Sequence, residues 1–358
     1  MVSAIRRQWP GAAELDVTLD GPAPGPREHE RSQVRALTYT ELTGCPAPGD
    51  RVLLNTTALD LGLGTGGYAL VIAMPDRLPA DQDGPGHLVK ARYTPVQATV
   101  LGADEQGSAY HEVLRDADDL GGMPVVIADL HSALPAVLAA LYTRRPGAIV
   151  AYVMQDGGAL PAWFSRSCAG LRQAGWLAAV VTAGQAFGGD LETVTVHTGL
   201  LAARHVLHAD LAVVSQGPGN LGTGTRWGFS GVASGEAVNA VAVLGGRPVA
   251  ALRVSDADPR ERHRGVSHHS LTAYGRVALA RADVVVPELP GPFGVRVIAE
   301  AQPLGLRHSL VRVPVDGLYE ALRACPVRLS TMGRGLDEDT AYFLAAAAAG
   351  RHAAALLG

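Results

Sequence analysis

The sequence predicts a small β-rich domain followed by a larger, doubly wound α/β domain. Two patterns indicate this division: residues 13–110 contain short strand-like runs separated by turn residues, and from residue 123 apolar runs alternate with longer helical segments. A chain of 358 residues also exceeds the usual size of one hydrophobic core. We therefore place the β-rich domain at residues 1–115 and the α/β domain at residues 116–358.

The first domain is predicted to be a small β-barrel or sandwich. Turn sequences such as Pro48-Gly49-Asp50 and Gly84-Pro85-Gly86 separate its strands, and no helical period lies between them. The expected strands are Glu14–Leu19, Val34–Thr40, Arg51–Thr56, Tyr68–Ala73 and His87–Leu101.

The second domain is predicted to contain a mainly parallel, Rossmann-like sheet. Parallel strands that are buried on both faces form continuous apolar runs. Such runs are found at Val125–Ala128, Ala148–Val153, Ala178–Thr182, Leu211–Ser215, Pro248–Val254 and Asp283–Pro287. The helices expected between them are Ala133–Tyr142, Pro161–Ala174, Val194–Leu207, Gly231–Leu244 and Ser270–Arg281.

The C-terminal segment is predicted to form an alanine-rich helix near Asp337–Ala349 that packs back on the sheet. The tail from Phe343 to Gly358 is interrupted by Arg351 and His352, and it is too weakly hydrophobic to span a bilayer. We expect a surface or interface helix, and a homodimer is one assembly that would use it.

Composition excludes some functions. The formal net charge is -4 and charged residues make up 18% of the chain, so no bulk attraction to nucleic acid or to an anionic membrane is expected. Cys45, Cys168 and Cys325 are widely spaced, which indicates neither a disulfide framework nor a thiolate zinc site. The N-terminus lacks the apolar core of a signal peptide. We expect a cytoplasmic protein with reduced cysteines and no metal requirement.

A ligand site is expected where the parallel strands end. Ligands of open parallel sheets bind outside the carboxyl ends of the strands, because loops and helix N-termini converge there. The segments at these ends are rich in glycine or in polar and ionisable residues; they are Asp129–His131, Gln155–Gly158, Ala183–Asp190, Gln216–Thr225 and Ser255–His269.

The glycine-rich loop Gln216–Thr225 is the strongest single motif. Glycines let backbone amides approach an anion closely, and two threonine hydroxyls add donors. The loop lacks the Walker lysine and the glycine spacing of a dinucleotide fingerprint, and a tight connection without ligand is the alternative. Its expected ligand-binding residues are Gly217, Gly219, Asn220, Gly222, Thr223, Gly224 and Thr225. The second glycine cluster, Gly62–Gly67, precedes a strand and favours a hairpin connection.

The segment His263–His269 is the most distinctive ionisable cluster. Imidazoles titrate near neutral pH and suit proton transfer or metal binding. We expect His268 or His269 to be the main proton-transfer group, with Asp256 as the carboxylate that orients it. Adjacent residues of a regular element point in different directions, so only one of the two histidines needs to face a ligand. No metal is assigned, because no H-E-x-x-H spacing is present; the alternative is a helix start capped by Ser267.

Other candidates are weaker. Asp156 and Asp190 each lie beside paired glycines, where a carboxylate can reach a crevice; Asp190 is taken as a catalytic candidate, and helix capping is the alternative for both. Arg264 could clamp an anion or simply be solvated. The remaining expected ligand-binding residues are Asp156, Gly157, Gly158, Gly188, Gly189 and Arg264. Ser165, Ser167 and Cys168 lie within an expected helix and do not resemble an activated nucleophile.

Three blocks of the chain resemble a known protein family. Arg51–Tyr68, Gln216–Gly231 and His263–His269 resemble an uncharacterised bacterial protein family of unknown function, and this resemblance extends over most of the chain. It implies no activity, and no cofactor is identified. The residues themselves predict an enzyme acting on a small anionic or polar metabolite. A non-catalytic ligand-binding or regulatory protein that uses the same crevice remains the alternative.

Overall fold

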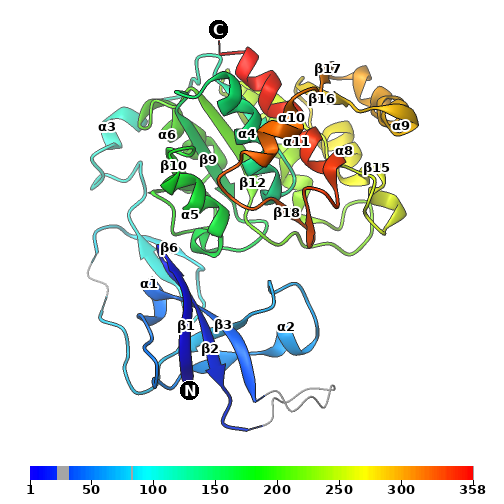
Figure 1. Cartoon of the computed structure of the whole chain (residues 1–358). Helices are drawn as coiled ribbons and strands as arrows, with labels where there is room; N and C mark the ends of the chain where they lie inside the picture. Colours follow the sequence, from blue (N-terminus) through cyan, green and yellow to red (C-terminus); the bar gives the residue numbers. More distant parts are fainter. Residues whose placement is uncertain (22–31, 82–83, 358) are drawn as a thin grey trace. The chain divides into compact units, whose positions relative to one another are not determined.

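The computed structural model describes residues 1–21, 32–81 and 84–357 (Figure 1). The chain divides into two compact units, one formed by Met1–Pro85 with Arg92–Thr99 and the other by Gly86–Ala91 with Val100–Gly358. The chain thus passes between the units within residues 85–100, whereas the sequence placed the boundary after residue 115. Each unit has its own hydrophobic core.

The first unit contains one five-stranded mixed sheet. Its strand order is β1 (Val2–Trp9), β2 (Ala12–Thr18), β3 (Gln33–Tyr39), β5 (Ala69–Ala73) and β4 (Leu53–Asn55). β3 and β5 are parallel and the other neighbours are antiparallel. Within the described residues β1 and β4 do not pair, so the sheet is open and is not the expected barrel or sandwich.

Two details of this sheet bear on the sequence predictions. Gly62–Gly67 lies between the antiparallel strands β4 and β5, after the short helix α2 (Thr57–Asp60), in agreement with a hairpin connection. β1 was not predicted, because most of its side chains are exposed and its pairing with β2 contains register irregularities that break the alternation of buried residues.

The second unit is built on a parallel sheet of eight strands. Every neighbouring pair in this sheet is parallel, and most of its residues are buried on both faces, as the continuous apolar runs predicted. The strand order is β11 (Leu191–Glu192), β10 (Ala179–Thr182), β9 (Val150–Gln155), β12 (Leu211–Gln216), β8 (Pro124–Ile127), β13 (Arg247–Ala251), β16 (Asp283–Glu288) and β17 (Ser309–Pro314).

Helices cover both faces of this sheet, which confirms the doubly wound α/β fold (Figure 1). One group consists of α4 (Leu134–Arg144), α10 (Leu318–Arg323) and α11 (Thr340–Ala355), which pack on one another. The other consists of α6 (Val196–His205), α7 (Ala233–Val243) and a π-helical turn at Ala273–Val277. Both groups contact the central strands.

The second unit also contains four further helices and four short strands. They are α3 (His111–Leu114), α5 (Arg166–Gln173), α8 (His268–Thr272), α9 (Gly291–Ala301), β14 (Val254–Ser255), β15 (Gly265–Val266), β18 (Ser330–Thr331) and β19 (Arg334–Gly335). Among the described residues, one short α-helix and two short strands remain. Helix α1 (Thr40–Thr43) belongs to the first unit, β6 (Leu88–Lys90) belongs to the second, and β7 (Ala98–Val100) spans the point where the chain passes from one unit to the other.

Helix α11 corrects the expectation of a surface or interface helix. Residues Ala345–Ala349 are almost completely buried, and the helix packs on α4 and on the sheet. A Cβ atom at Gly350 would collide with the carbonyl oxygen of Val137 in α4. Alanine and glycine therefore serve here to let two helices approach closely inside the core. Among the described helices, none is long and apolar enough to cross a membrane.

The topology creates a crevice at the carboxyl ends of β8 and β12. The chain leaves β8 through α4 toward β9, and it leaves β12 through α7 toward β13, on the other side of β8. Right-handed crossovers in opposite directions place α4 and α7 on opposite faces of the sheet. A ligand crevice of a doubly wound fold lies at such a point.

Candidate functional site

Segments that follow three adjacent strands meet at this edge of the sheet. Gln216–Thr225 follows β12, Asp129–His131 follows β8, and Arg253 with Ser255–His269 follows β13. The short antiparallel pair β14 and β15 folds the last segment back, so that α8 begins beside the other two.

Two cavities open among these segments. A cavity of about 200 Å³ is lined by Gln216–Asn220 together with His131 and Thr331. A smaller one of about 90 Å³ is lined by Asn220, Leu221, Gly222, Gly224, Arg253, Arg260, Arg262, His263, His269 and Met332. Asn220 and Met332 line both, so the cavities are neighbours.

The first half of the glycine-rich loop packs against the segment after β9. The amide of Ala159 donates to the Pro218 carbonyl at 2.7 Å. A Cβ at Gly158 would collide with the Gly217 carbonyl, and a Cβ at Gly217 would collide with the Ala159 carbonyl. A Cβ at Gly157 would likewise collide with the side chain of Gln216. Three of the glycines expected to bind ligand thus allow two backbones to pack together.

The second half of the loop is a self-contained turn. The hydroxyls of Thr223 and Thr225 lie 3.1 Å apart, and Thr225 Oγ1 accepts the amide of Gly228 at 3.1 Å. These hydroxyls, which the sequence assigned to ligand binding, are therefore used within the turn. Gly224 has φ +82° and lies beside the guanidinium of Arg262.

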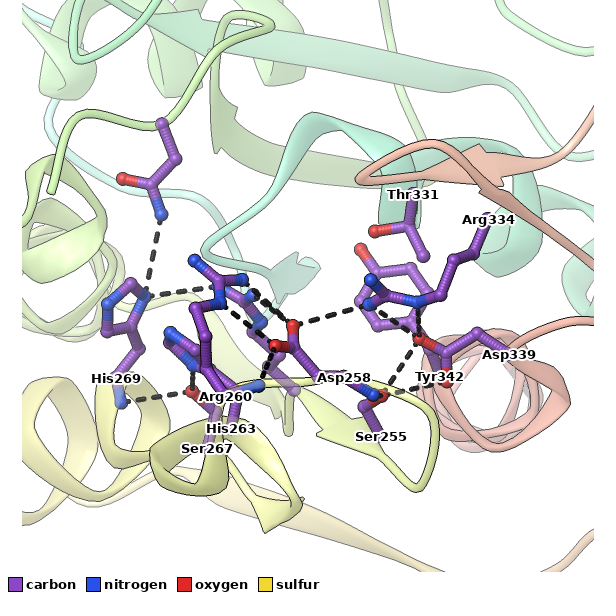
Figure 2. Close-up of polar contacts among 12 residues, drawn as sticks. Ser255, Asp258, Arg260, His263, Ser267, His269, Thr331, Arg334, Asp339 and Tyr342 are labelled. Atoms are coloured by element: carbon purple, nitrogen blue, oxygen red, sulfur yellow. Dashed lines mark hydrogen bonds and ion pairs between the residues drawn. The ribbon is translucent and has the colours of Figure 1, made fainter. Parts of the chain in front are cut away.

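A buried ionic network includes Arg253 and Arg260, which line the smaller cavity (Figure 2). Asp258 Oδ2 lies 2.8 Å from Arg260, 3.3 Å from Arg334 and 3.6 Å from Arg253. Burial opposes ionisation of Asp258, but hydrogen bonds and positive charge from Arg260 hold its pKa below the usual range.

The same network includes two further carboxylates. Asp339 pairs with Arg334 at 2.9 Å and accepts the Ser255 hydroxyl, and burial raises its pKa. Asp129 Oδ2 lies 3.6 Å from Arg253. Burial opposes ionisation of Asp129 too, but its hydrogen bond with His269 and the charge of Arg253 lower its pKa.

The carboxylate beside His269 is Asp129, and not Asp256. Nδ1 of His269 lies 3.3 Å from Asp129 Oδ2 and 3.3 Å from a guanidinium nitrogen of Arg253. The ring stacks on Phe229 with centroids 3.7 Å apart. Asp256 is exposed, and its backbone carbonyl accepts from Arg264. The carboxylate that tertiary packing brings to His269 is therefore Asp129, which follows β8, and Asp256 does not lie beside this ring.

His263, His268 and His269 lie together. The centroid separations are 5.0 Å for His263–His268, 4.8 Å for His263–His269 and 4.5 Å for His268–His269. Ser267 caps α8 by accepting the amide of His269, as the alternative interpretation expected. Both adjacent histidines nevertheless face the same cluster, because they occupy the first turn of a short helix. Burial is the main cause that lowers the pKa of His263 to about 3, and nearby arginine charges add to it. Burial is also the main cause that lowers the pKa of His268 to about 4, and the charges of His269 and nearby arginines add to it.

His131, at the larger cavity, is held by two side chains. Its Nδ1 lies 2.9 Å from the hydroxyl of Tyr152, and its Nε2 lies 2.7 Å from that of Ser165. Burial lowers the pKa of His131 to about 4. Ser165 also accepts the amide of Cys168 as the N-cap of α5, which gives this serine a structural role.

The lowered pKa of His131 predicts acid sensitivity. His131 binds a proton near pH 6.5 in the unfolded chain but only near pH 4 in the folded chain. The free energy of unfolding is therefore highest above pH 6.5 and decreases as the pH falls from 6.5 toward 4. The full shift corresponds to about 3 kcal/mol. We expect His131→Gln to lose less stability than the unsubstituted chain between pH 7.5 and pH 4.5, as measured by urea unfolding in chelator-containing buffer. Exposed His197→Gln should keep the original pH slope; equal slopes in the chain with and without His131 would contradict the assignment.

Several expected site residues lie outside both cavities. Asp190 binds Arg172 and the amide of Val180, and Asp156 accepts the amide of Gln185. Gly188 packs on Trp163 and Gly189 on the carbonyl of Val180. Arg264 is exposed and does not line either cavity. These residues shape the loops around the carboxyl edge.

Several residues of the site were missed, including Arg260 and Arg262 of the small cavity. Asp129, Arg253 and Asp258 are buried ionisable residues, and Gln216 is a buried amide whose Oε1 accepts no hydrogen bond from the described residues. Asp129 and Gln216 each lie at the end of an apolar strand run, a signal that was available. No sequence pattern distinguishes Arg253 and Asp258 as buried site residues from the exposed Asp256 and Arg264 nearby.

Comparisons with known proteins agree with the resemblance carried by the three sequence blocks. No curated protein and no solved structure matches the chain. A family model described as "Protein of unknown function (DUF3866)" matches residues 35–350, which is most of the chain. The chain therefore belongs to the DUF3866 family of proteins of unknown function.

Proposed function

We propose that this protein is an enzyme that binds a small anionic metabolite at the carboxyl edge of the parallel sheet. The observation that carries the proposal is the 90 Å³ cavity, in which three arginines and two histidines face the glycine-rich loop. A cavity of about 90 Å³ is larger than one ordered water needs, so it has room for a phosphate or carboxylate group. Guanidinium groups are the side chains best suited to bind such oxyanions.

Arg262 is the arginine most available to a ligand. Arg253 and Arg260 are paired with carboxylates of the buried network. In the described parts of the chain no carboxylate pairs with Arg262, which is exposed and lies beside Gly224. A bound anion would supply the missing negative charge.

The larger cavity suits the rest of the metabolite. Its lining includes the uncharged polar residues Ser132, Ser330 and Gln216. A hydroxyl or amino group of the ligand could donate to the buried Oε1 of Gln216. The ligand expected here has an anionic group at one end and a hydrogen-bond donor at the other.

His269 is the residue we assign to proton transfer. With the proton on Nδ1 donated to Asp129, Nε2 is left as the basic nitrogen, and the ring lines the small cavity. The pairing of a histidine with a carboxylate beside an oxyanion pocket favours an enzyme over a protein that only binds.

Calorimetry with inorganic phosphate and pyrophosphate tests the proposal. We expect saturable binding at one site per chain, weakened at least about tenfold in Arg262→Ala because one guanidinium–oxyanion contact is lost. Arg264→Ala is the matched control, since Arg264 is exposed in the same segment but does not line the cavity. The absence of saturable binding, or equal weakening in the two variants, would contradict the proposal. Binding without turnover of any phosphorylated metabolite would favour the non-catalytic alternative.

A further inference from the structure

The second feature of this edge is the convergence of three imidazole rings. One ring nitrogen from each of His263, His268 and His269 lies within 4.8 Å of one from each of the others. Two of the rings are buried and the third is partly buried. Phe229 contacts the rings of both His268 and His269.

The hydrogen bonds around these rings involve Nδ1 of His263 and Nδ1 of His269, and the latter also lies 3.3 Å from a guanidinium nitrogen of Arg253 and 3.5 Å from the side-chain nitrogen of Asn220. Nδ1 of His269 lies 3.3 Å from Asp129, and Nδ1 of His263 lies 2.7 Å from the hydroxyl of Ser267. Figure 2 shows Ser267 between His263 and His269. When Nδ1 donates to these oxygens, Nε2 of each ring carries the lone pair. Nε2 of His268 is buried and has no hydrogen-bond partner among the described residues.

We propose that His263, His268 and His269 together bind one divalent transition-metal ion such as Zn²⁺. In the metal-bound protein the free ring nitrogen of His269 is a ligand, so the proton transfer proposed above for that nitrogen applies only to the metal-free chain. Imidazole nitrogen is a preferred ligand of this class of ions. Metal-bound histidines commonly donate their other ring N–H to a carboxylate, hydroxyl or carbonyl, and Asp129 and Ser267 are placed to accept it. The unpartnered Nε2 of His268 also acquires a partner.

The required movement is small. Metal–nitrogen bonds of about 2.1 Å in a tetrahedral site place ligand nitrogens about 3.4 Å apart. The ring nitrogens lie within 4.8 Å of one another, so side-chain rotations that shift each nitrogen by about 1 Å or less bring them to this spacing.

Carboxylates balance part of the positive charge near the rings. The guanidinium groups that act on His263 or His268 are those of Arg253, Arg260 and Arg262. Asp129 and Asp258 pair with Arg253 and Arg260, whereas Arg262 has no carboxylate partner among the described residues and its charge opposes a cation. Three protein ligands leave a fourth coordination position open. His263 and His269 line the small cavity, so that position would face the anion of the proposed function; only this last point rests on that proposal.

Metal titration of the chelator-treated full chain tests the site. We expect one Zn²⁺ or Co²⁺ per chain by calorimetry, and a visible Co²⁺ spectrum of a nitrogen-rich site. His268→Ala should weaken binding at least about 100-fold, because it removes a direct ligand. Ser267→Ala should weaken it about tenfold, because it removes the hydrogen bond to His263 Nδ1 and the N-cap of α8 but no ligand. Exposed His197→Ala is the matched control and should bind as the unsubstituted chain does.

Two results would overturn the metal site: no stoichiometric binding, or equal affinity in His268→Ala and His197→Ala. His268 is the least buried of the three, so its variant is the one best able to fold. Phosphate calorimetry on the chelator-treated chain separates the two proposals. Phosphate binding without metal binding refutes the metal site alone, and metal binding without phosphate binding refutes the anion site alone.

Discussion

Arg253→Met is expected to reduce the free energy of unfolding by about 3–5 kcal/mol. The side chain of Arg253 is 4% exposed and lies between Asp129 and Asp258, at 3.6 Å from each. Methionine fills a similar volume, but the substitution leaves Asp129 buried without the guanidinium of Arg253. It also removes one of the three guanidinium groups around Asp258. Urea unfolding at pH 7.5 measures the loss.

Arg264→Met is the control for this prediction. Arg264 belongs to the same polar segment but is exposed, and among the described residues its guanidinium donates only to the backbone carbonyl of Asp256, at 3.4 Å. Surface changes of this kind usually alter stability by less than about 0.5 kcal/mol. A loss below about 1 kcal/mol in Arg253→Met would show that the buried carboxylates do not depend on Arg253.

Gly350→Val is expected to cost about 3 kcal/mol or more. The first added carbon would collide with the carbonyl oxygen of Val137, so α11 and α4 must move apart or distort. Both helices are buried along most of their length, and overpacking of a dense core forces strain on its neighbours. Thermal and urea unfolding should both show the loss.

Gly147→Val is the matched control for the helix contact. A Cβ at Gly147 meets no atom within 4 Å, and its φ is not in the left-handed region. We expect a change of less than about 0.5 kcal/mol in this exposed connection. If Gly350→Val were as stable as Gly147→Val, the close approach of α11 to α4 would not be a feature of the folded protein.

The fold of the second unit could be predicted because its strands are buried on both faces. Runs such as Leu211–Ser215 and Asp283–Pro287 leave few alternatives to a parallel sheet. Helix α11 shows the limit of this reasoning: an alanine-rich segment is only weakly hydrophobic, and whether it lies on the surface or in a crowded core depends on the space beside α4. That space is a property of tertiary packing.

The candidate site was predictable in position but not in detail. Strand ends indicated Gln216–Thr225 and His263–His269, and both segments line the small cavity. The choice of Asp256 failed because proximity in sequence was taken for proximity in space, whereas Asp129 reaches His269 from 140 residues away. The convergence of His268 and His269 was missed because the argument from alternating directions does not hold for long side chains at a helix start.

A crystal structure of the protein grown with phosphate tests the central claim, which is that the carboxyl edge of the sheet binds an anion. We predict tetrahedral density in the 90 Å³ cavity, within hydrogen-bond distance of Arg262 and at least one of Arg253 and His269. Phosphate bound only elsewhere on the molecule, with this cavity filled by the protein's own side chains, would contradict the claim.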